Sequence, residues 1–503
     1  MLQRITSVYI FLLLTVFLLA FSADGYGAIS DVKHGLFMLI CGGYVLIMAI
    51  LRLMYVITGT RGIGNIRDIF KETSVATKFL IGFLLATILS TLFATYPGSF
   101  RGEFRSEGLL TIGIYVLSCY IVSIYFSPKK WMLFTLGISM VPVSVIALIQ
   151  LTGANPFTLY PLGHNFYGAG IYYSGQFLST IGNSGLLAAF LCLAVGVLAM
   201  ALIKFDFKER WYLSFPFFIT LLLIFEKGIN AAVFSLVVGS VLILPVAITN
   251  RKSFANTLIV CSMIKAAFAL SQVLVFQDGP ILFDPIPVLT VIAAAAVALL
   301  SVLVLKVDIF EKFTTKQYRV GAVILMFAAM CTALAFVWLQ GMGTSGMIYE
   351  ASHVMRGNVD DTFGTRRIYI WRNVIEHIQL NTLLLGTGPD TLGHWPIPPF
   401  TRLTDDGIYL TSIIDSAHNE PLHILATGGL LSLITYLGAL LFAAIKWIKL
   451  PENTLSAVAG AGVLFYVLQA LFGISQFITA PFFWTCFGVL LFAQSKEYER
   501  EQV

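Results

Sequence analysis

The stretch GLLAAFLCLAVGVLAMALI, residues 185–203, decides the fold class because it holds nineteen positions without a charged side chain. A helix that crosses the hydrocarbon core of a bilayer needs about 20 apolar residues. Similar runs recur along the 503-residue chain, which is 58% apolar and 11% charged, with a mean hydropathy of +0.87. Soluble domains carry about 25% charged residues, so this composition excludes a soluble multidomain enzyme, a disordered chain, a coiled coil and a nucleic-acid-binding domain.

The apolar runs predict an all-α polytopic transmembrane bundle of about 14 spans, since the alternating segments that mark a membrane β-barrel are absent. The first run also resembles a signal peptide, and we favour an uncleaved span. The expected spans cover residues 5–22, 35–57, 79–96, 109–126, 131–152, 185–203, 211–225, 229–249, 254–277, 286–305, 320–340, 422–445, 456–474 and 481–494.

Lysine and arginine residues orient the bundle, because cytoplasmic loops of membrane proteins are enriched in them. With both termini in the cytoplasm, 21 of these residues fall on inner connections and nine on outer ones. Lys265 falls inside a span, where a cation is a functional candidate by default, and the sequence suggests no role for it. The six cysteines all lie in apolar stretches, which predicts buried side chains without disulfides.

The longest non-spanning segment, residues 341–421, is expected on the outer side. It separates the N-terminal spans of residues 1–340 from the C-terminal spans and short tail of residues 422–503. Loops longer than about 15 residues are usually functional or disordered. Residues 363–385 have helical apolar spacing, which predicts a helix lying on the outer membrane surface. Residues 386–389, GTGP, are expected to end that helix, and an irregular proline-containing stretch follows.

A second outer connection, residues 153–184, contains no charged residue. Its aromatic side chains fit two hypotheses, anchoring at the membrane interface or a lid that faces lipid or sugar. These aromatic residues are Tyr160, Phe166, Tyr167, Tyr172, Tyr173 and Phe177.

A polar cluster, DSAHNE at residues 415–420, precedes the span that starts near Leu422. One hypothesis is a catalytic site at the outer interface. The other is helix capping, in which Asp415 or Ser416 caps the following helix and Asn419 or Glu420 satisfies its first turn. His418 and His423 are five positions apart and do not share a helix face, so no metal site is expected. A nucleophile elbow and a reactive cysteine are also absent.

Four ordered motifs resemble the O-antigen ligase and Wzy-type polysaccharide polymerase superfamily. They are RIYIW (367–371), LGTGP (385–389), DSAHNEPL (415–422) and GGLLSLITYL (428–437). Upstream, FRSEGLLT (104–111) resembles an R-x-E-G element of some members, and residues 476–488 resemble the final span of the family. The clear resemblance covers about residues 360–490.

The resemblance implies an all-helical, GT-C-like glycosyltransferase of the bacterial inner membrane. Such an enzyme moves a glycan from undecaprenyl diphosphate to a hydroxyl of a lipid, protein or glycan acceptor on the outer face, without a metal ion or cofactor. Fixed cations must then meet the charge of the leaving diphosphate, and arginine offers a bidentate fork.

The family pattern assigns candidate roles to several residues. Arg105 and Arg367 are the first candidates for diphosphate binding, with Arg366 and Arg372 as neighbours. His418 fits a proton acceptor, which Asn419 and Glu420 would position. Asp415 is a further candidate. Glu103 and Glu107 are expected either to act with Arg105 or simply to pair with it.

The sequence departs from the family where many members have a Ser-Arg-Gly-like element. Here Lys227 stands in that region and would supply a point charge instead of a fork. Asn183 is a further possible site residue, because members often have an asparagine-rich turn there.

Two other functions remain open. A transporter or flippase of lipid-linked oligosaccharide would place ionisable residues along several spans, and Lys265 is the clear mid-span case. A structural membrane protein would not need a His-Asn-Glu cluster beside arginine.

Overall fold

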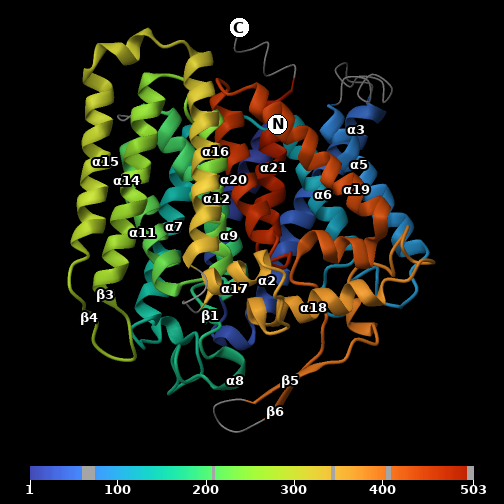
Figure 1. The fold of residues 1–503 in the computed structure, drawn as a ribbon. Coiled ribbons are helices and arrows are strands. Elements are labelled where there is room, and N and C mark those ends of the chain that lie inside the picture. The colour runs from blue at the N-terminus through green and yellow to red at the C-terminus, as the bar shows by residue number, and fades with distance from the viewer. Residues whose placement is uncertain (59–73, 207–209, 341–345, 404–408, 496–503) are drawn as a thin grey trace.

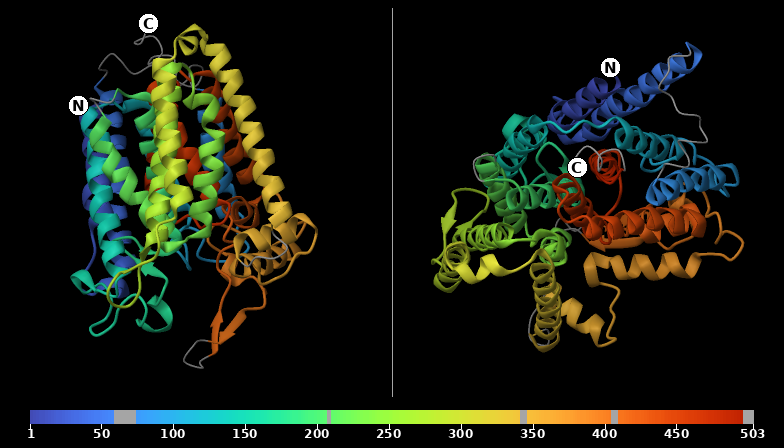
Figure 2. Two further views of the ribbon diagram at one scale, coloured as in Figure 1. Left: turned by 60° about the vertical axis from the view of Figure 1, so that its left-hand side comes forward. Right: turned by 90° about the horizontal axis from the view of Figure 1, so that it is seen from above.

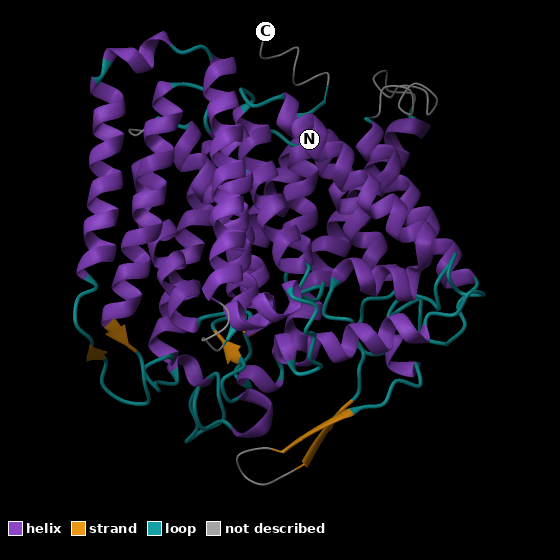
Figure 3. Ribbon diagram, viewed as in Figure 1, coloured by secondary structure: helices purple, strands orange, loops and turns teal. Residues whose placement is uncertain are grey.

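The structure, a computed structural model, describes residues 1–58, 74–206, 210–340, 346–403 and 409–495. Figures 1 and 3 show a bundle of roughly parallel helices with a small layer of loops and hairpins at one end. Each of the fourteen apolar segments expected from the sequence contains a helix. These helices are α1 (Leu2–Leu12), α2 (Ile29–Phe37) with α3 (Gly43–Ile57), α5 (Val75–Leu92), α6 (Leu109–Tyr125), α7 (Lys130–Gln150), α9 (Ser184–Lys204), α11 (Ser214–Lys227), α12 (Asn230–Leu242) with α13 (Leu244–Ala247), α14 (Arg251–Val273), α15 (Val288–Lys306), α16 (Thr315–Gln340), α19 (Glu420–Lys449), α20 (Thr454–Ala470) and α21 (Ala480–Ala493).

Short elements complete the described chain. The π-helical turns η1 (Leu13–Phe17) and η3 (Met38–Gly42) continue α1 and α2. The expected all-α fold also contains three short antiparallel strand pairs. The remaining elements are η2 (Gly25–Gly27), η4 (Pro156–Thr158), α8 (Gly170–Tyr173), β1 (Phe177–Leu178), β2 (Gly182–Asn183), η5 (Trp211–Leu213), β3 (Leu274–Val275), β4 (Leu282–Phe283), η6 (Asp308–Lys312), α17 (Met347–Met355), α18 (Phe363–His377), η7 (Leu392–His394), β5 (Phe400–Leu403) and β6 (Tyr409–Ser412).

The polytopic membrane character of the prediction is confirmed. Among the described residues, eight helices are long and apolar enough to cross a bilayer, and five further apolar helices are shorter. The count of 14 crossings and the GT-C-like arrangement stay predictions. The side chains of Tyr172 and Arg402 lie outside the described part of the chain. So do six basic residues that were used to orient the bundle, namely Arg61, Arg67, Lys71, Lys208, Lys496 and Arg500.

Helix α9, which contains the stretch that decides the fold, is the centre of the bundle. Its apolar window is entirely buried, and it packs most closely on α20. At Gly196 a Cβ atom would lie 2.6 Å from the carbonyl oxygen of Ala461, so the glycine lets the two backbones approach. Helices α15 and α16 lie at the edge, with large apolar side chains exposed as a lipid-facing surface requires. Cys331 on α16 is exposed, so the expected burial is wrong for this cysteine; all six cysteines are free.

The layer of loops lies at the end of the bundle opposite Met1 and the end of α21, as two views show (Figures 1 and 2). At this end the side chain of Lys33 is buried and donates to the carbonyl oxygens of Phe17 and Leu18. These carbonyls are at the end of the first helix, where helical partners run out. Lys33 therefore completes a helix end inside the protein.

Helix α19 is broken inside its apolar length. Gly429 has φ 75° and ψ −178°, and the break frees backbone groups on both sides. The carbonyl oxygen of Thr427 accepts hydrogen bonds from the Gly388 amide and the Ser90 hydroxyl. The amides of Leu430 and Leu431 donate to residues 383 and 384. Irregular backbone at membrane depth is tolerated only where protein satisfies it, and here the segment before Pro389 does so.

The contact between residues 383–388 and the break in α19 corrects two expectations for the long outer segment. The helix predicted at residues 363–385 ends at His377, and the GTGP motif lies against the α19 break instead of ending α18. At Gly386 a Cβ atom would lie 2.2 Å from the Thr427 carbonyl oxygen, so the motif serves close backbone approach. The stretch after the prolines, expected to be irregular, includes the β5–β6 hairpin.

Part of the apolar stripe of α18 faces protein instead of lipid. Ile370 and Val374 are buried in a small core with Leu392, Trp395 and Ala417. Figure 1 shows the helix running across the end of the bundle, as an interfacial helix would. The helix therefore packs against the loop layer, and the expected burial in the membrane surface is wrong for Ile370 and Val374, whereas Ile375 of the same stripe is exposed.

In the 153–184 connection, Tyr160 and Phe166 are buried, whereas Tyr167 is exposed. The rings of Tyr160, Tyr173 and Phe177 surround Tyr26. Interfacial anchoring is therefore wrong for the buried members, whose apolar surface stabilises the loop itself.

Candidate functional site

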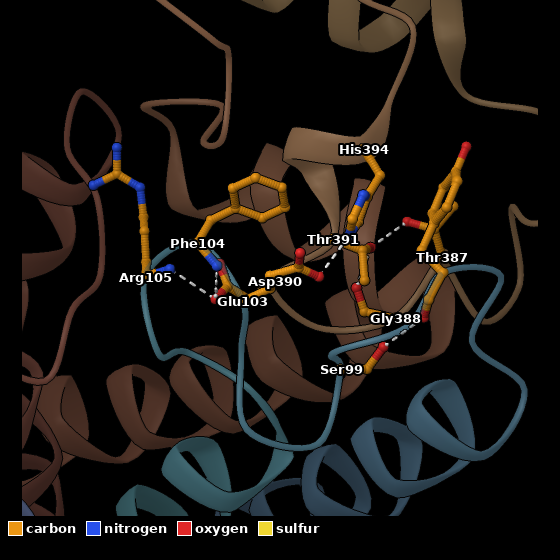
Figure 4. Close-up of polar contacts among 10 residues, drawn as sticks. Ser99, Glu103, Phe104, Arg105, Thr387, Gly388, Asp390, Thr391 and His394 are labelled. Atoms are coloured by element: carbon orange, nitrogen blue, oxygen red, sulfur yellow. Dashed lines mark hydrogen bonds and ion pairs between the residues drawn. The ribbon is translucent and has the colours of Figure 1, made fainter.

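Asp390 joins the two loops that form the candidate site. One of its carboxylate oxygens accepts hydrogen bonds from the backbone amides of Phe104, Arg105 and Glu107, at 3.1, 2.8 and 3.4 Å. Figure 4 shows the Asp390 side chain meeting this loop from the neighbouring segment. A carboxylate that gathers several amides fixes the loop between α5 and α6 in one conformation.

The loop fixed by Asp390 presents Arg105. Its guanidinium forms an ion pair with Asp415 at 2.7 Å, and both side chains are only partly exposed. The buried Nε of Arg105 has no hydrogen-bond partner among the described residues. The pairing of Arg105 with Glu103 or Glu107 is wrong: Glu103 contacts His394 at 2.9 Å, and Glu107 accepts from the Tyr115 hydroxyl and the Phe477 amide. Burial raises the pKa of Glu107 well above its usual range.

Arg367 follows a strained turn at the start of α18. Gly364, Thr365 and Arg366 have φ of 62°, 56° and 68°, and an L-residue in this left-handed region costs about 1–2 kcal/mol. The turn brings the carbonyl oxygen of Gly364 to 2.8 Å from the Arg367 guanidinium. The Nε of Arg367 is buried without a described partner, and burial lowers the pKa of this side chain.

The two other arginines of α18 lie differently. Arg366 is exposed. Arg372 forms an ion pair with Asp361, with both of its terminal nitrogens at 3.0 Å from carboxylate oxygens. Its charge is therefore already matched by a carboxylate on the exposed side of the loop layer.

His418 is half-buried, and the charges of Arg105 and Arg367 act on its imidazole. The Trp371 indole donates to the carbonyl oxygen of Ala417 at 2.9 Å, which ties α18 to the residue before the histidine. Desolvation by burial, together with the charges of Arg105 and Arg367, lowers the pKa of His418 to about 3. The imidazole is therefore neutral at any physiological pH, with one ring nitrogen able to accept a proton.

Asn419 and Glu420 support the histidine from the start of α19. Asn419 is the N-cap: its side chain accepts from the Leu422 amide at 2.9 Å and donates to the carbonyl oxygen of Leu471 at 3.0 Å. The capping hypothesis therefore holds for Asn419, and not for Asp415 or Ser416. Glu420 is buried, accepts from the Tyr436 hydroxyl at 3.1 Å and keeps its second oxygen without a described partner.

A cavity of about 70 Å³, which we call the outer cavity, lies beside Arg105 and reaches into the bundle. Its lining includes six side chains with a buried polar atom that has no described hydrogen-bond partner, namely Arg105, Asp390, Glu420, His423, Ser432 and Trp484. Buried polar groups are normally paired, and this volume admits a few water molecules. The lining is therefore prepared for polar occupants.

Backbone strain gathers at the same place. Eight non-glycine residues in the described ranges have positive φ, and five of them are Ser106, Thr365, Arg366, Asp390 and His418. Such conformations persist only where the surrounding structure imposes them, and they are typical of functional sites. All five come from the loops around Arg105, Arg367 and His418.

Three predicted residues lie apart from this cluster. Lys227 donates to the carbonyl oxygen of Gly175 and lies over the ring of Phe166. Asn183 caps α9 by accepting from the amides of Gly185 and Leu186. Lys265 is exposed on α14, with no hydrogen bond to the described residues. The hydrogen bonds and ring contact described here do not join any of the three to Arg105, Arg367 or His418.

Sequence reasoning missed Asp390 and Trp371 as residues that position the site. Asp390 directly follows the LGTGP motif, and a carboxylate after a Gly-Pro turn was an available signal. For Trp371 the sequence offers no comparable signal, because the bond from its indole joins residues 46 positions apart.

Two comparisons with known proteins complete the description. Residues 286–437 match the protein family described as O-Antigen ligase. This range includes Arg367, Asp390 and His418, whereas Arg105 lies before it. No curated protein matches the chain.

Proposed function

Since this chain belongs to the O-antigen ligase/Wzy superfamily of glycosyltransferase-like enzymes of the bacterial inner membrane, we propose that it transfers a glycan from undecaprenyl diphosphate to an acceptor hydroxyl. The observation that carries the proposal is the convergence of Arg105, Arg367 and His418 from three separate segments. The acceptor belongs to a lipid, a protein or a growing glycan. The site faces the extracytoplasmic side, and both termini face the cytoplasm.

The two arginines bind the donor diphosphate. Both have a buried Nε–H without a described partner, and an arginine uses this group together with a terminal nitrogen to grip phosphate in a fork. As the bond between sugar and phosphate breaks, its electrons move to the phosphate oxygen, and fixed cations stabilise that charge without reorganisation. These arginines thus supply the charge that a metal ion would otherwise supply, so the transfer is metal-independent.

His418 accepts the proton of the acceptor hydroxyl while the hydroxyl oxygen forms a bond to the sugar carbon. The free imidazole is a weak base, because burial and the two arginines oppose its protonation. A bound diphosphate would neutralise the arginines and thereby raise the basicity of His418 when the donor is present. Asn419 and Glu420 act as positioning residues, and Asp415 holds Arg105 until the donor arrives.

Complementation in cells that lack their own surface-polysaccharide ligase or polymerase tests this proposal. Wild type and the variants Arg105→Ala, Arg367→Ala and His418→Ala are compared at matched membrane levels, with glycan attachment and length read on a gel. General acid–base catalysis contributes about 10²–10⁴-fold, so His418→Ala should abolish visible transfer. Arg101→Ala, an exposed arginine in the same loop as Arg105, is the matched control and should retain activity.

The pattern of products then separates the subclasses. A ladder of lengths indicates a polymerase, and a single transfer indicates a ligase. If glycan transfer survives all three site substitutions, the assignment of Arg105, Arg367 and His418 to the site is wrong. That result would favour a transporter of lipid-linked oligosaccharide.

A further inference from the structure

A second and larger cavity, which we call the inner cavity, lies toward the opposite end of the bundle. Its volume is about 420 Å³, and its walls come from α1, α7, α9, α20 and α21. Two lysines, Lys129 and Lys130, line it at the start of α7, which is expected to face the cytoplasm. Most of the remaining lining is apolar, including Leu136, Leu193, Val197 and Val489.

The inner cavity is long as well as large. The lining extends from Phe190 in α9 to Phe205, the residue that follows the helix, and these fifteen steps along the helix rise by roughly 20 Å. A depth of this size is comparable to one leaflet and more of the hydrocarbon core. The cavity thus runs along the membrane normal and not across the bundle.

Two polar side chains on α21 that line the inner cavity are already paired. The Thr485 hydroxyl is bonded to that of Tyr9 at 2.9 Å, and the Cys486 thiol donates to the carbonyl oxygen of Ala459. Among the described side chains that line it, none has a buried polar atom without a partner. The wall therefore offers hydrocarbon contact along its length and positive charge only at Lys129 and Lys130.

We propose that the inner cavity binds an acyl chain of an anionic phospholipid from the cytoplasmic leaflet, with the lipid phosphate held by Lys129 and Lys130. Protein interiors contain few voids larger than a water molecule, so an apolar space of this size requires an apolar occupant. The cytoplasmic leaflet carries the anionic lipids, and basic pockets between helices on that side select their head groups. The charge of the two lysines is complementary to this lipid.

The inference rests on the predicted orientation of the bundle and not on glycan transfer. The lipid would fill the space between α7 and the helices α20 and α21, in a cavity whose lining shares no residue with the outer cavity. Binding of the lipid and transfer of the glycan are therefore separate properties, and each can fail without the other.

Native mass spectrometry of the purified full-length protein tests the proposal. The protein is titrated with phosphatidylglycerol or with phosphatidylethanolamine of the same acyl chains. A lysine near an anionic lipid surface contributes about fivefold to binding, so two lysines should give phosphatidylglycerol an advantage of roughly 30-fold. The double variant Lys129→Ala/Lys130→Ala should lose this preference, whereas Lys312→Ala/Lys316→Ala, exposed lysines on the same end of the bundle, should keep it.

A second variant tests the cavity itself. Val489→Phe narrows the inner cavity and should reduce the binding of both lipids, whereas Val237→Phe at an exposed position of α12 should not. Thermal unfolding in detergent verifies that each variant is folded. Three outcomes would each overturn the proposal: equal binding of the two lipids, unchanged selectivity in the Lys129/Lys130 variant, or unchanged binding by Val489→Phe.

Discussion

The outer cavity and the inner cavity differ in nearly every physical property. The outer cavity is about 70 Å³ and is lined by loops, by the broken helix α19 and by parts of α5, α6 and α21, whereas the inner cavity is about 420 Å³ and is lined mainly by regular helices. Six side chains around the outer cavity have buried unpartnered polar atoms, and none of the described side chains around the inner one does. The contrast teaches that the smaller space is the one prepared for polar chemistry.

The two cavities should also differ in their tolerance to substitution. Around the outer cavity, strained residues and single hydrogen bonds hold charged groups in place, so one lost contact displaces several atoms. Around the inner cavity, many small apolar contacts share the energy, and each contributes little alone. The predictions below test this difference, beginning with the largest expected effect.

The break in α19 should be the most sensitive point. In Gly429→Ala, the new Cβ would lie 2.4 Å from the Gly386 amide nitrogen in a backbone with φ 75°. We expect the free energy of unfolding to fall by about 3 kcal/mol or more, because strain and a backbone clash act together. Thermal unfolding in detergent measures this, with Gly113→Ala as the control, since nothing lies within 4 Å of a Cβ there. Equal stability of the two variants would contradict the docking of residues 382–388.

Loss of the Asp390 carboxylate should come next. Asp390→Ala leaves three backbone amides of the Arg105 loop without their acceptor, and an unpaired buried group costs about 1–3 kcal/mol. We expect glycan transfer to fall at least about tenfold, a factor that corresponds to about 1.4 kcal/mol. Asp390→Asn keeps an oxygen acceptor and should recover part of the activity. If the alanine and asparagine variants are equally active, Asp390 does not position Arg105.

Acid sensitivity should report the burial of His418. Its pKa is about 3 in the folded protein, while a histidine in the unfolded chain takes up a proton near 6.5. Between these values the unfolded chain binds more protons, so the free energy of unfolding falls as the pH is lowered from about 6.5. His418→Asn should flatten this dependence in thermal unfolding at pH 7 and pH 4. An unchanged slope would mean that His418 is solvated.

The bond that positions His418 should have a smaller effect. Trp371→Phe keeps an aromatic ring in the core of the loop layer and removes the hydrogen bond to the Ala417 carbonyl oxygen. One such bond contributes about 1 kcal/mol, so we expect transfer to fall roughly fivefold at unchanged membrane levels. A loss as large as that of His418→Ala would show that Trp371 touches substrate.

The inner cavity should be the least sensitive region for catalysis. Val489→Phe alters lipid binding far from the site, and substitutions away from critical contacts usually change free energies by less than about 0.5 kcal/mol. We therefore expect glycan transfer within about twofold of wild type in the complementation assay. A large loss of transfer would mean that the two cavities are coupled, which would break the comparison.

The sequence by itself determined the membrane-spanning bundle, because burial in lipid requires long apolar helices wherever they lie in the chain. Residues 185–203 form α9 within a residue at each end, and all fourteen apolar segments contain a helix. The motifs also made Arg105, Arg367 and His418 candidates, through their resemblance to a family of glycosyltransferases.

Only the tertiary structure decided how these residues meet. The sequence could not show that Arg105 pairs with Asp415, 310 positions away, or that Asp390 gathers the amides of its loop. Nor could it show that the GTGP motif occupies the break in α19, because its glycines satisfy the rules for a helix stop equally well. Local patterns fix what a segment prefers by itself, whereas pairing, strain and cavities depend on neighbours that folding brings from distant parts of the chain.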